Sequence, residues 1–154
     1  MTLLVQKYGG TSVGDLERIR KVAECVGRTA DEGHGVVVVV SAMAGETDKL
    51  VGMARALSEF PNQREMDYLL SSGEGVTSSL LAIALNDQGH PGMSFTGLRA
   101  GIRTTGAHTS ARIRTIAADE IVAVLEKGAI PVVAGFQGAD DNQDVTTLGR
   151  GGSD

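Results

Sequence analysis

The stretch VVVVVSAMAG, residues 36–45, decides the fold. Five consecutive valines make a strand that is apolar on both faces, which is typical of an inner strand of a parallel sheet covered on two sides. The strand runs into small and hydroxyl-bearing residues, and ligands of open α/β sheets gather at this carboxyl edge. The stretch therefore predicts an α/β fold with a ligand site directly after residue 40.

Strands and helices alternate outward from this stretch. The segment LLVQKY, residues 3–8, predicts a strand that ends at Gly9-Gly10, and apolar residues at helical spacing predict a helix over about 15–32. Two further helices are predicted, over 46–59 and from 66 onward, the second with a break near 71–75 because Gly73 and Gly75 interrupt its apolar stripe. The remaining expectations are strands at 92–95, 130–134 and 145–148, a hairpin or irregular segment over 97–116, a helix from 118 to Gly128, and a polar turn over 138–144. This alternation predicts a mostly parallel sheet in one domain, 1–154.

Composition narrows the classes of function. The chain of 154 residues carries a formal net charge of −5, few aromatic residues and no basic run, which argues against a nucleic-acid binder. No apolar run is long enough for a membrane span, and the start shows no secretory signal. A single cysteine, Cys25, excludes an internal disulfide and a cysteine-rich zinc site, so we expect a protein of the reducing cytoplasm. The place of Cys25 on a helical stripe predicts a core thiol.

The segment Lys7-Tyr8-Gly9-Gly10-Thr11-Ser12 lies between a predicted strand and a predicted helix. Two glycines allow backbone N–H groups to approach a phosphate, and the helix N-terminus favours negative charge. Lys7 could stabilise charge that develops during phosphoryl transfer. The alternative is an ordinary strand-to-helix turn with a solvated lysine, since neither a Walker A loop nor G-x-G-x-x-G is present.

Two further segments carry polar groups into the predicted site. Residues 41–47, SAMAGET, suit a cradle for a polar ligand, although Thr47 or Glu46 could instead cap the following helix. Glu74 interrupts an apolar helical stripe, so its carboxylate must be paired or lie beside a wet cleft, where a cationic amino group could bind it. The alternative is a solvent-facing glutamate beside a glycine kink.

The chain ends in Gly149-Arg150-Gly151-Gly152-Ser153-Asp154. Arg150 could hold a carboxylate through two parallel hydrogen bonds, and Asp154 could orient Lys7 or help to hold magnesium, unless the segment is a flexible tail. The segment has the pattern of a loop that leads into the N-terminus of a helix, and the residues of that helix are not in the sequence. We therefore expect the sequence to be a piece of a longer protein. Segments 7–12, 41–47, 135–138 and 149–154 all follow predicted strands, and together with 72–75 we expect them to surround one cleft.

Taken together, the motifs resemble those of the aspartate kinases of the amino acid kinase superfamily. The resemblance spans nearly the whole chain in the family's order, and Tyr8 stands where the family often has phenylalanine. It implies a three-layer α/β/α sandwich of the amino acid kinase or carbamate kinase-like type. The motifs that carry it are KYGGTSVGDLERIRKVA, VVVVVSAMAGETDKL, SSGEGVTSSLLAIAL, PVVAGFQG and TTLGRGGSD.

The resemblance also implies a reaction: ATP, with Mg²⁺, phosphorylates the side-chain carboxylate of L-aspartate to aspartyl 4-phosphate, the first step toward lysine, threonine and methionine. Lys7 would stabilise the transferring phosphoryl group and Asp154 would organise the catalytic lysines. The implied phosphate-binding residues are Lys7, Tyr8, Gly9, Gly10 and Ser12.

The implied aspartate-binding residues are Ser41, Thr47, Glu74, Arg150 and Ser153. Glu74 would bind the amino group, Arg150 would bind the α-carboxylate, and Ser153 would contact the same ligand. No residue is assigned as a protein ligand of a metal.

Family members continue with a second half that supplies most nucleotide contacts, and many add regulatory ACT domains; neither is in this sequence. We therefore expect the amino-acid-binding lobe of an aspartate kinase, with little activity alone and with homo-oligomeric assembly. The alternatives are a non-catalytic module that binds aspartate or mediates subunit association, and a kinase for glutamate, acetylglutamate or carbamate. No nucleic-acid or membrane partner is expected.

Overall fold

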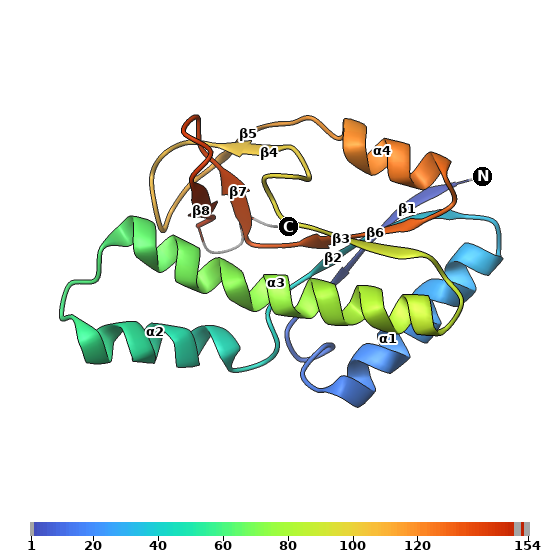
Figure 1. Ribbon diagram of the computed structural model, residues 1–154, viewed down its shortest axis with the longest axis horizontal. Helices are drawn as coiled ribbons and strands as arrows, with labels where there is room; N and C mark the ends of the chain where they lie inside the picture. Colours follow the sequence, from blue (N-terminus) through green and yellow to red (C-terminus); the bar gives the residue numbers. More distant parts are fainter. Residues whose placement is uncertain (1, 150–151, 153–154) are drawn as a thin grey trace.

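The computed structural model describes residues 2–149 and 152, which form helices and strands in two sheets (Figure 1). The helices are α1 (Leu16–Asp31), α2 (Glu46–Leu57), α3 (Gln63–Asp87) and α4 (Asp119–Glu126). The strands are β1 (Leu3–Tyr8), β2 (Gly35–Val40), β3 (Gly92–Phe95), β4 (Ile102–Thr104), β5 (Ile113–Ile116), β6 (Ile130–Ala134), β7 (Gln137–Ala139) and β8 (Val145–Thr147).

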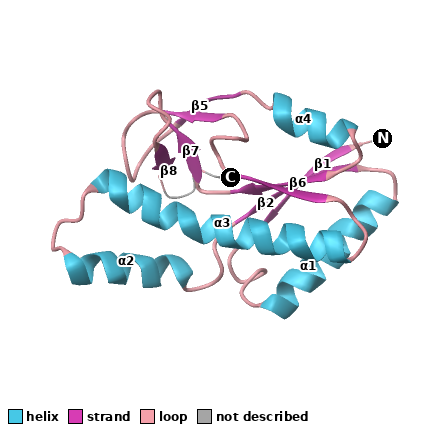
Figure 2. Ribbon diagram, viewed as in Figure 1, coloured by secondary structure: helices cyan, strands magenta, loops and turns pink. Residues whose placement is uncertain are grey.

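The first sheet has the strand order β1-β2-β6-β3, and all its pairs are parallel. The valine strand β2 lies inside the sheet, as predicted, with Val36, Val38 and Val40 facing α1 and α3. Val37 and Val39 face α4 on the opposite side. Figure 2 shows these helices on the two sides of the sheet, which confirms the three-layer α/β/α sandwich.

The ends of α1 follow the predicted signals. The Asp15 carboxylate accepts a hydrogen bond of 2.8 Å from the backbone N–H of Arg18, so it caps the first turn. Gly33 has a φ of +88° just beyond the helix, a conformation that favours glycine. Helix α1 therefore occupies the range expected from the sequence.

Helix α3 is continuous, so the predicted break near 71–75 is wrong. A Cβ atom at Gly73 would lie 2.9 Å from the Cβ of Ala42, so this glycine lets the helix approach the segment after β2. Gly73 thus indicates a site of close packing and not the end of a helix. By length and composition α3 could cross a membrane, but it packs against the first sheet and buries two carboxylates, as a core helix does.

The second sheet, with the order β5-β4-β7-β8, is mixed, and the sequence does not predict it as a separate sheet. The hairpin expected within 97–116 is present as β4 and β5, but β7 extends into the range 138–144 where the sequence predicts only a turn. Between β6 and β7, Phe136 has a φ of +64°, and there the chain passes from one sheet to the other. Strands of three residues carry too little alternation to be recognised in sequence.

Candidate functional site

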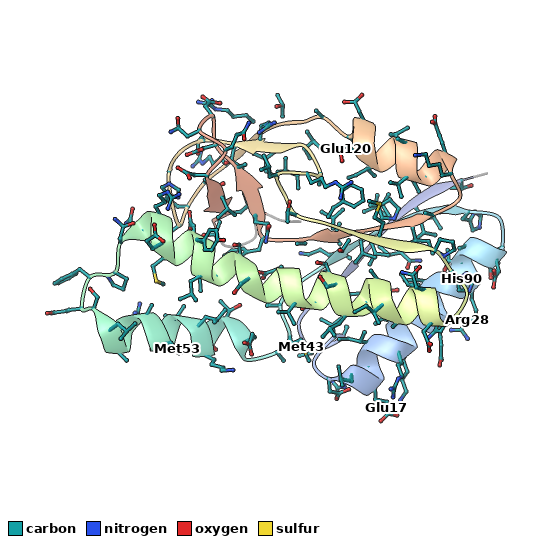
Figure 3. The ribbon with its side chains drawn as sticks, in the orientation of Figure 1. Glu17, Arg28, Met43, Met53, His90 and Glu120 are labelled. Carbon is teal, nitrogen blue, oxygen red and sulfur yellow. The ribbon has the colours of Figure 1, made fainter. Side chains whose placement is uncertain are left out.

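A cavity of about 340 Å³ lies at the carboxyl ends of β2 and β6. The segment after β2 forms most of its wall, helix α3 contributes Glu74, and the turn after β6 contributes Phe136. Figure 3 labels Met43, one of the wall residues, in the segment that joins β2 to α2. The lining residues are Gly10, Ser41, Ala42, Met43, Ala44, Gly45, Thr47, Glu74 and Phe136.

Ala42 is clamped between two glycines at the base of this cavity. A Cβ atom at Gly10 would lie 2.9 Å from the Ala42 carbonyl oxygen, and one at Gly73 would lie 2.9 Å from the Ala42 Cβ. The Ala44 N–H also donates to the Gly10 carbonyl at 3.2 Å. Neither glycine accepts a side chain without movement of the backbone around Ala42, so this wall of the cavity is held closely in place.

Glu74 is the chemically exceptional residue of the cavity. Its side chain is 3% exposed, and its Oε1 accepts a hydrogen bond of 3.2 Å from the Ala42 N–H. Its Oε2 is buried and has no hydrogen-bond partner in the part of the chain that the structure describes. Burial raises the pKa of the Glu74 carboxyl from 4.5 to about 7, although the hydrogen bond from Ala42 opposes this. A carboxylate in this state favours a ligand that brings a cationic donor.

The expected convergence of segments is confirmed for residues 41–47, Gly10 and Glu74. Ser41 and Thr47, both predicted to bind the substrate, line the cavity. Lys7 does not line it: in register with Val39, its side chain leaves β1 on the α4 face, whereas Glu74 comes from α3 on the other face. The expectation that Lys7 and Glu74 share one cleft is therefore not met by this cavity.

Tyr8 and Ser12 line a different hollow, a groove of about 440 Å³ beside α1 that also contains Thr11, Arg18, Lys21, Val22 and Cys25. The Tyr8 hydroxyl donates to Gln6 Oε1 at 3.0 Å, and burial together with a hydrogen bond to Cys25 raises the pKa of Tyr8 to about 12. Cys25 is exposed, so the predicted core thiol is wrong. The buried stripe of α1 passes through its neighbours Val22 and Val26.

Of the final loop, Gly149 and Gly152 lie within the described residues. They line a third hollow, of about 460 Å³, together with Ser110, Ala111, Arg112 and Ile113. Arg150, Ser153 and Asp154, three of the predicted site residues, lie outside the described residues. Their proposed roles stay predictions.

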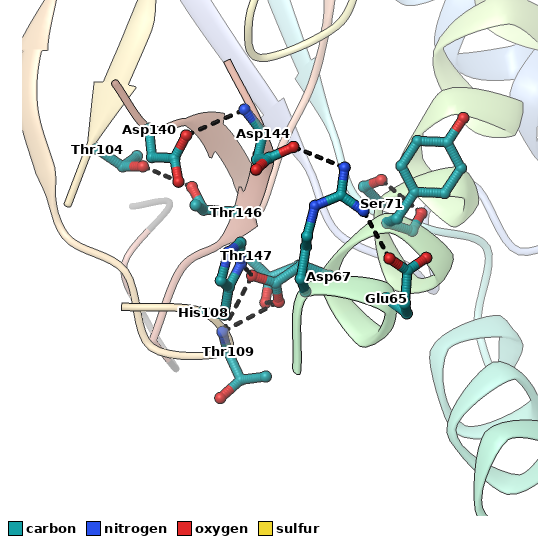
Figure 4. A network of polar contacts seen from close by, with 12 residues as sticks. Glu65, Asp67, Ser71, Thr104, His108, Thr109, Asp140, Asp144, Thr146 and Thr147 are labelled. Atoms are coloured by element: carbon teal, nitrogen blue, oxygen red, sulfur yellow. Dashed lines mark hydrogen bonds and ion pairs between the residues drawn. The ribbon is translucent and has the colours of Figure 1, made fainter. Parts of the chain in front are cut away.

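Sequence reasoning singled out neither Phe136 nor Asp67. Phe136 lies in the strand-end segment 135–138, but nothing in its identity separates it from a core phenylalanine. Asp67 is fully buried, and Figure 4 shows its contacts with His108, Thr109 and Thr147. It precedes Glu74 by seven residues, two helical turns, and a second carboxylate at that spacing on an apolar helix was a usable signal.

Comparison with known proteins identifies the family of the chain. The family model described as "Amino acid kinase family" matches residues 2–154. Aspartokinase 2 of Bacillus subtilis is 53% identical over 154 residues, which are 100% of this chain and 38% of that protein. The chain thus spans less than two fifths of the length of this relative.

Solved structures of aspartate kinases also resemble this chain. A crystal structure of aspartate kinase from Synechocystis matches with a TM-score of 0.83 and 45% identity, over 99% of this chain and 24% of that one. E. coli aspartokinase III in complex with aspartate and ADP matches with a TM-score of 0.84 and 24% identity, over 99% of this chain and 44% of that one, and supports the fold alone. With the family match over nearly its whole length, the chain belongs to the amino acid kinase family.

Proposed function

We propose that this protein is an aspartate kinase, which transfers the terminal phosphoryl group of ATP to the side-chain carboxylate of L-aspartate. The product would be aspartyl 4-phosphate, at the start of a route to other amino acids. The observation that carries the proposal is the buried Glu74 Oε2, which lacks a partner among the described residues and belongs to a residue that lines a cavity of about 340 Å³. The aspartokinase relatives supply the choice of substrate.

Glu74 would bind the α-ammonium group of aspartate. That group has a positive charge and several N–H donors, so it can satisfy Oε2 while Oε1 keeps its bond to Ala42. The hydroxyls of Ser41 and Thr47 line the same cavity and can bind polar atoms of the ligand. Arg150 and Ser153 are proposed to bind the α-carboxylate side of the ligand, as the family resemblance implies.

The phosphate donor would lie at the Gly9-Gly10 turn. Among the described residues other than its two chain neighbours, no atom lies within 4 Å of the position that a Cβ of Gly9 would take. We infer that this side of the turn is open to a ligand. Lys7 is proposed to stabilise the transferred group, and Asp154 to organise Lys7. Mg²⁺, bound with the phosphates of ATP, would neutralise negative charge during transfer. Catalysis would then rest on position and electrostatics, without a covalent intermediate.

Phosphorylation assays with a panel of acceptors test this proposal. The full-length gene product, ATP and Mg²⁺ are incubated with aspartate, glutamate, acetylglutamate or carbamate, while ADP release and trapping of the acyl phosphate by hydroxylamine are measured. We expect turnover with aspartate and background with the other three acceptors. Turnover with another acceptor would change the substrate, and binding of aspartate without turnover would favour a non-catalytic module. Cytoplasmic location and homo-oligomeric assembly are further parts of the proposal.

A further inference from the structure

The buried carboxylate of Asp67 joins three parts of the molecule. Its oxygens accept hydrogen bonds from the Thr109 N–H at 3.0 and 3.1 Å, from the Thr147 hydroxyl at 2.5 Å, and from His108 Nδ1 at 2.7 Å (Figure 4). Asp67 belongs to α3, residues 108–109 to the segment between β4 and β5, and Thr147 to β8. One side chain thus fastens the second sheet to the helix that carries Glu74.

A second contact between α3 and the second sheet lies one turn further along the helix. The Gln137 Nε2 donates to the Ser71 carbonyl at 3.1 Å, and the Gly97 N–H donates to Gln137 Oε1 at 3.2 Å. Positions 67, 71 and 74 fall on one face of α3, because successive helical turns bring residues three and four apart together. This face contacts β8 through Asp67, β7 through Ser71, and the segment after β2 through Glu74.

The contacts lead from Asp67 to the wall of the cavity. Thr147 pairs with Gln137 in the second sheet, and the Leu148 N–H donates to the Phe136 carbonyl at 2.9 Å. Phe136 lines the same cavity as Glu74 and holds an unfavourable φ of +64°. A residue in such a conformation keeps its place only when surrounding contacts fix it. Two contacts join this neighbourhood to α3: the Gln137 side chain bonds to the Ser71 carbonyl, and the Thr147 hydroxyl bonds to Asp67.

We propose that Asp67 is a positioning residue, which acts through Thr147 to hold Phe136 at a fixed place relative to Glu74. Asp67 does not line the cavity and is not expected to touch the substrate. Insofar as it concerns aspartate binding, this inference rests on the proposed function. Loss of the contact should leave the phosphate-binding side of the reaction nearly unchanged and should weaken binding of the amino acid.

Variants of two neighbouring threonines test the proposal. Thr147→Val removes one hydroxyl donor to Asp67, Thr147→Ser keeps that donor, and Asp67→Asn removes the charge. Thr146→Val is the matched control: Thr146 is equally buried on β8, but its hydroxyl bonds at 2.5 Å to Thr104 within the second sheet. Steady-state kinetics of the full-length gene product should show the aspartate KM raised about tenfold in Thr147→Val and restored in Thr147→Ser. The ATP KM should change by less than about twofold.

Amide hydrogen exchange supplies a readout that needs no substrate. The Leu148 N–H should exchange faster in Thr147→Val and Asp67→Asn than in Thr146→Val, because its acceptor is the Phe136 carbonyl. Unchanged exchange in Thr147→Val overturns the proposal, as does an aspartate KM that rises equally in Thr146→Val. If the wild-type protein phosphorylates no aspartate, the proposed function fails, and the exchange of Leu148 alone decides whether Asp67 positions the cavity wall.

Discussion

Replacement of Glu74 by glutamine should abolish a pH dependence of aspartate binding. Burial raises the pKa of this carboxyl to about 7 in the protein without ligand. An ammonium group favours the ionised carboxylate, so wild-type binding should tighten as the pH rises through about 7 and level off above it. With that pKa, the Glu74 carboxyl is ionised in roughly one molecule in eleven near pH 6 and in about nine in ten near pH 8. The Kd for aspartate should therefore be about tenfold higher at the lower pH.

Isothermal titration with aspartate at the two pH values measures this effect. Two buffers of different ionisation enthalpy report the proton that wild-type Glu74 releases on binding near pH 6. In Glu74→Gln the Kd should be equal at both pH values and about tenfold to a hundredfold above the wild-type value near pH 8, because a charge-assisted hydrogen bond is lost. Glu65→Gln is the control: Glu65 is also on α3 but 65% exposed, and should leave the profile unchanged. A wild-type Kd that does not change with pH would refute the reasoning.

Three further predictions concern stability and association. Between pH 4.5 and about 7 the folded protein holds more protons at Glu74 than the unfolded chain does. The wild-type free energy of unfolding, measured by urea titration, should therefore fall by about 3 kcal/mol as the pH rises through this interval. The Glu74→Gln variant should not show this fall. Gly73→Ala should lower the free energy of unfolding by about 1–3 kcal/mol through its clash with Ala42. Gly75→Ala should raise it by about 0.5–1 kcal/mol, because among the described residues nothing outside its own helix lies within 4 Å of the Gly75 Cβ position. An equal effect of the two substitutions would contradict the packing argument. The 154-residue chain should self-associate through β1, because β1 is an edge strand and its Val5 is 66% exposed. Sedimentation experiments should show this association, and Val5→Lys should shift the chain toward monomer. A wild-type chain that is monomeric at all concentrations would count against the prediction.

Regular parts of the fold follow from local sequence, and the irregular parts do not. The valine run specifies an inner parallel strand because only a strand covered on both faces can bury it. Gly73 shows the opposite case: within its own helix it has the signature of a breaker, and only the position of Ala42 reveals that it is a packing contact. The second sheet could not be predicted from the sequence for a related reason. Its strands β7 and β8 are three residues long and are stabilised by partners that are distant in sequence.

Some residues of the candidate site could likewise be predicted from the sequence, and others could not. Glu74 and residues 41–47 could be predicted, because a carboxylate within an apolar stripe needs a partner or a wet cleft and a polar strand end is where such a cleft forms. That Lys7 leaves the sheet on the opposite face from Glu74 depends on the register of β1 with β2, which the sequence does not display. The role of Asp67 depends on which hydroxyl and N–H groups surround it once the second sheet has formed.

The clamp on Ala42 limits how this cavity can be redesigned. Any single substitution at Gly10 or Gly73 adds at least a methyl group where the backbone or side chain of Ala42 already lies, so variants at these positions should lose stability, and larger side chains should cost more than alanine. Thr47 and Phe136 line the cavity from other elements and already carry side chains that can be exchanged for smaller ones. Directed evolution toward a larger or differently charged amino acid should therefore proceed through those two positions, with the glycine side of the cavity inherited unchanged.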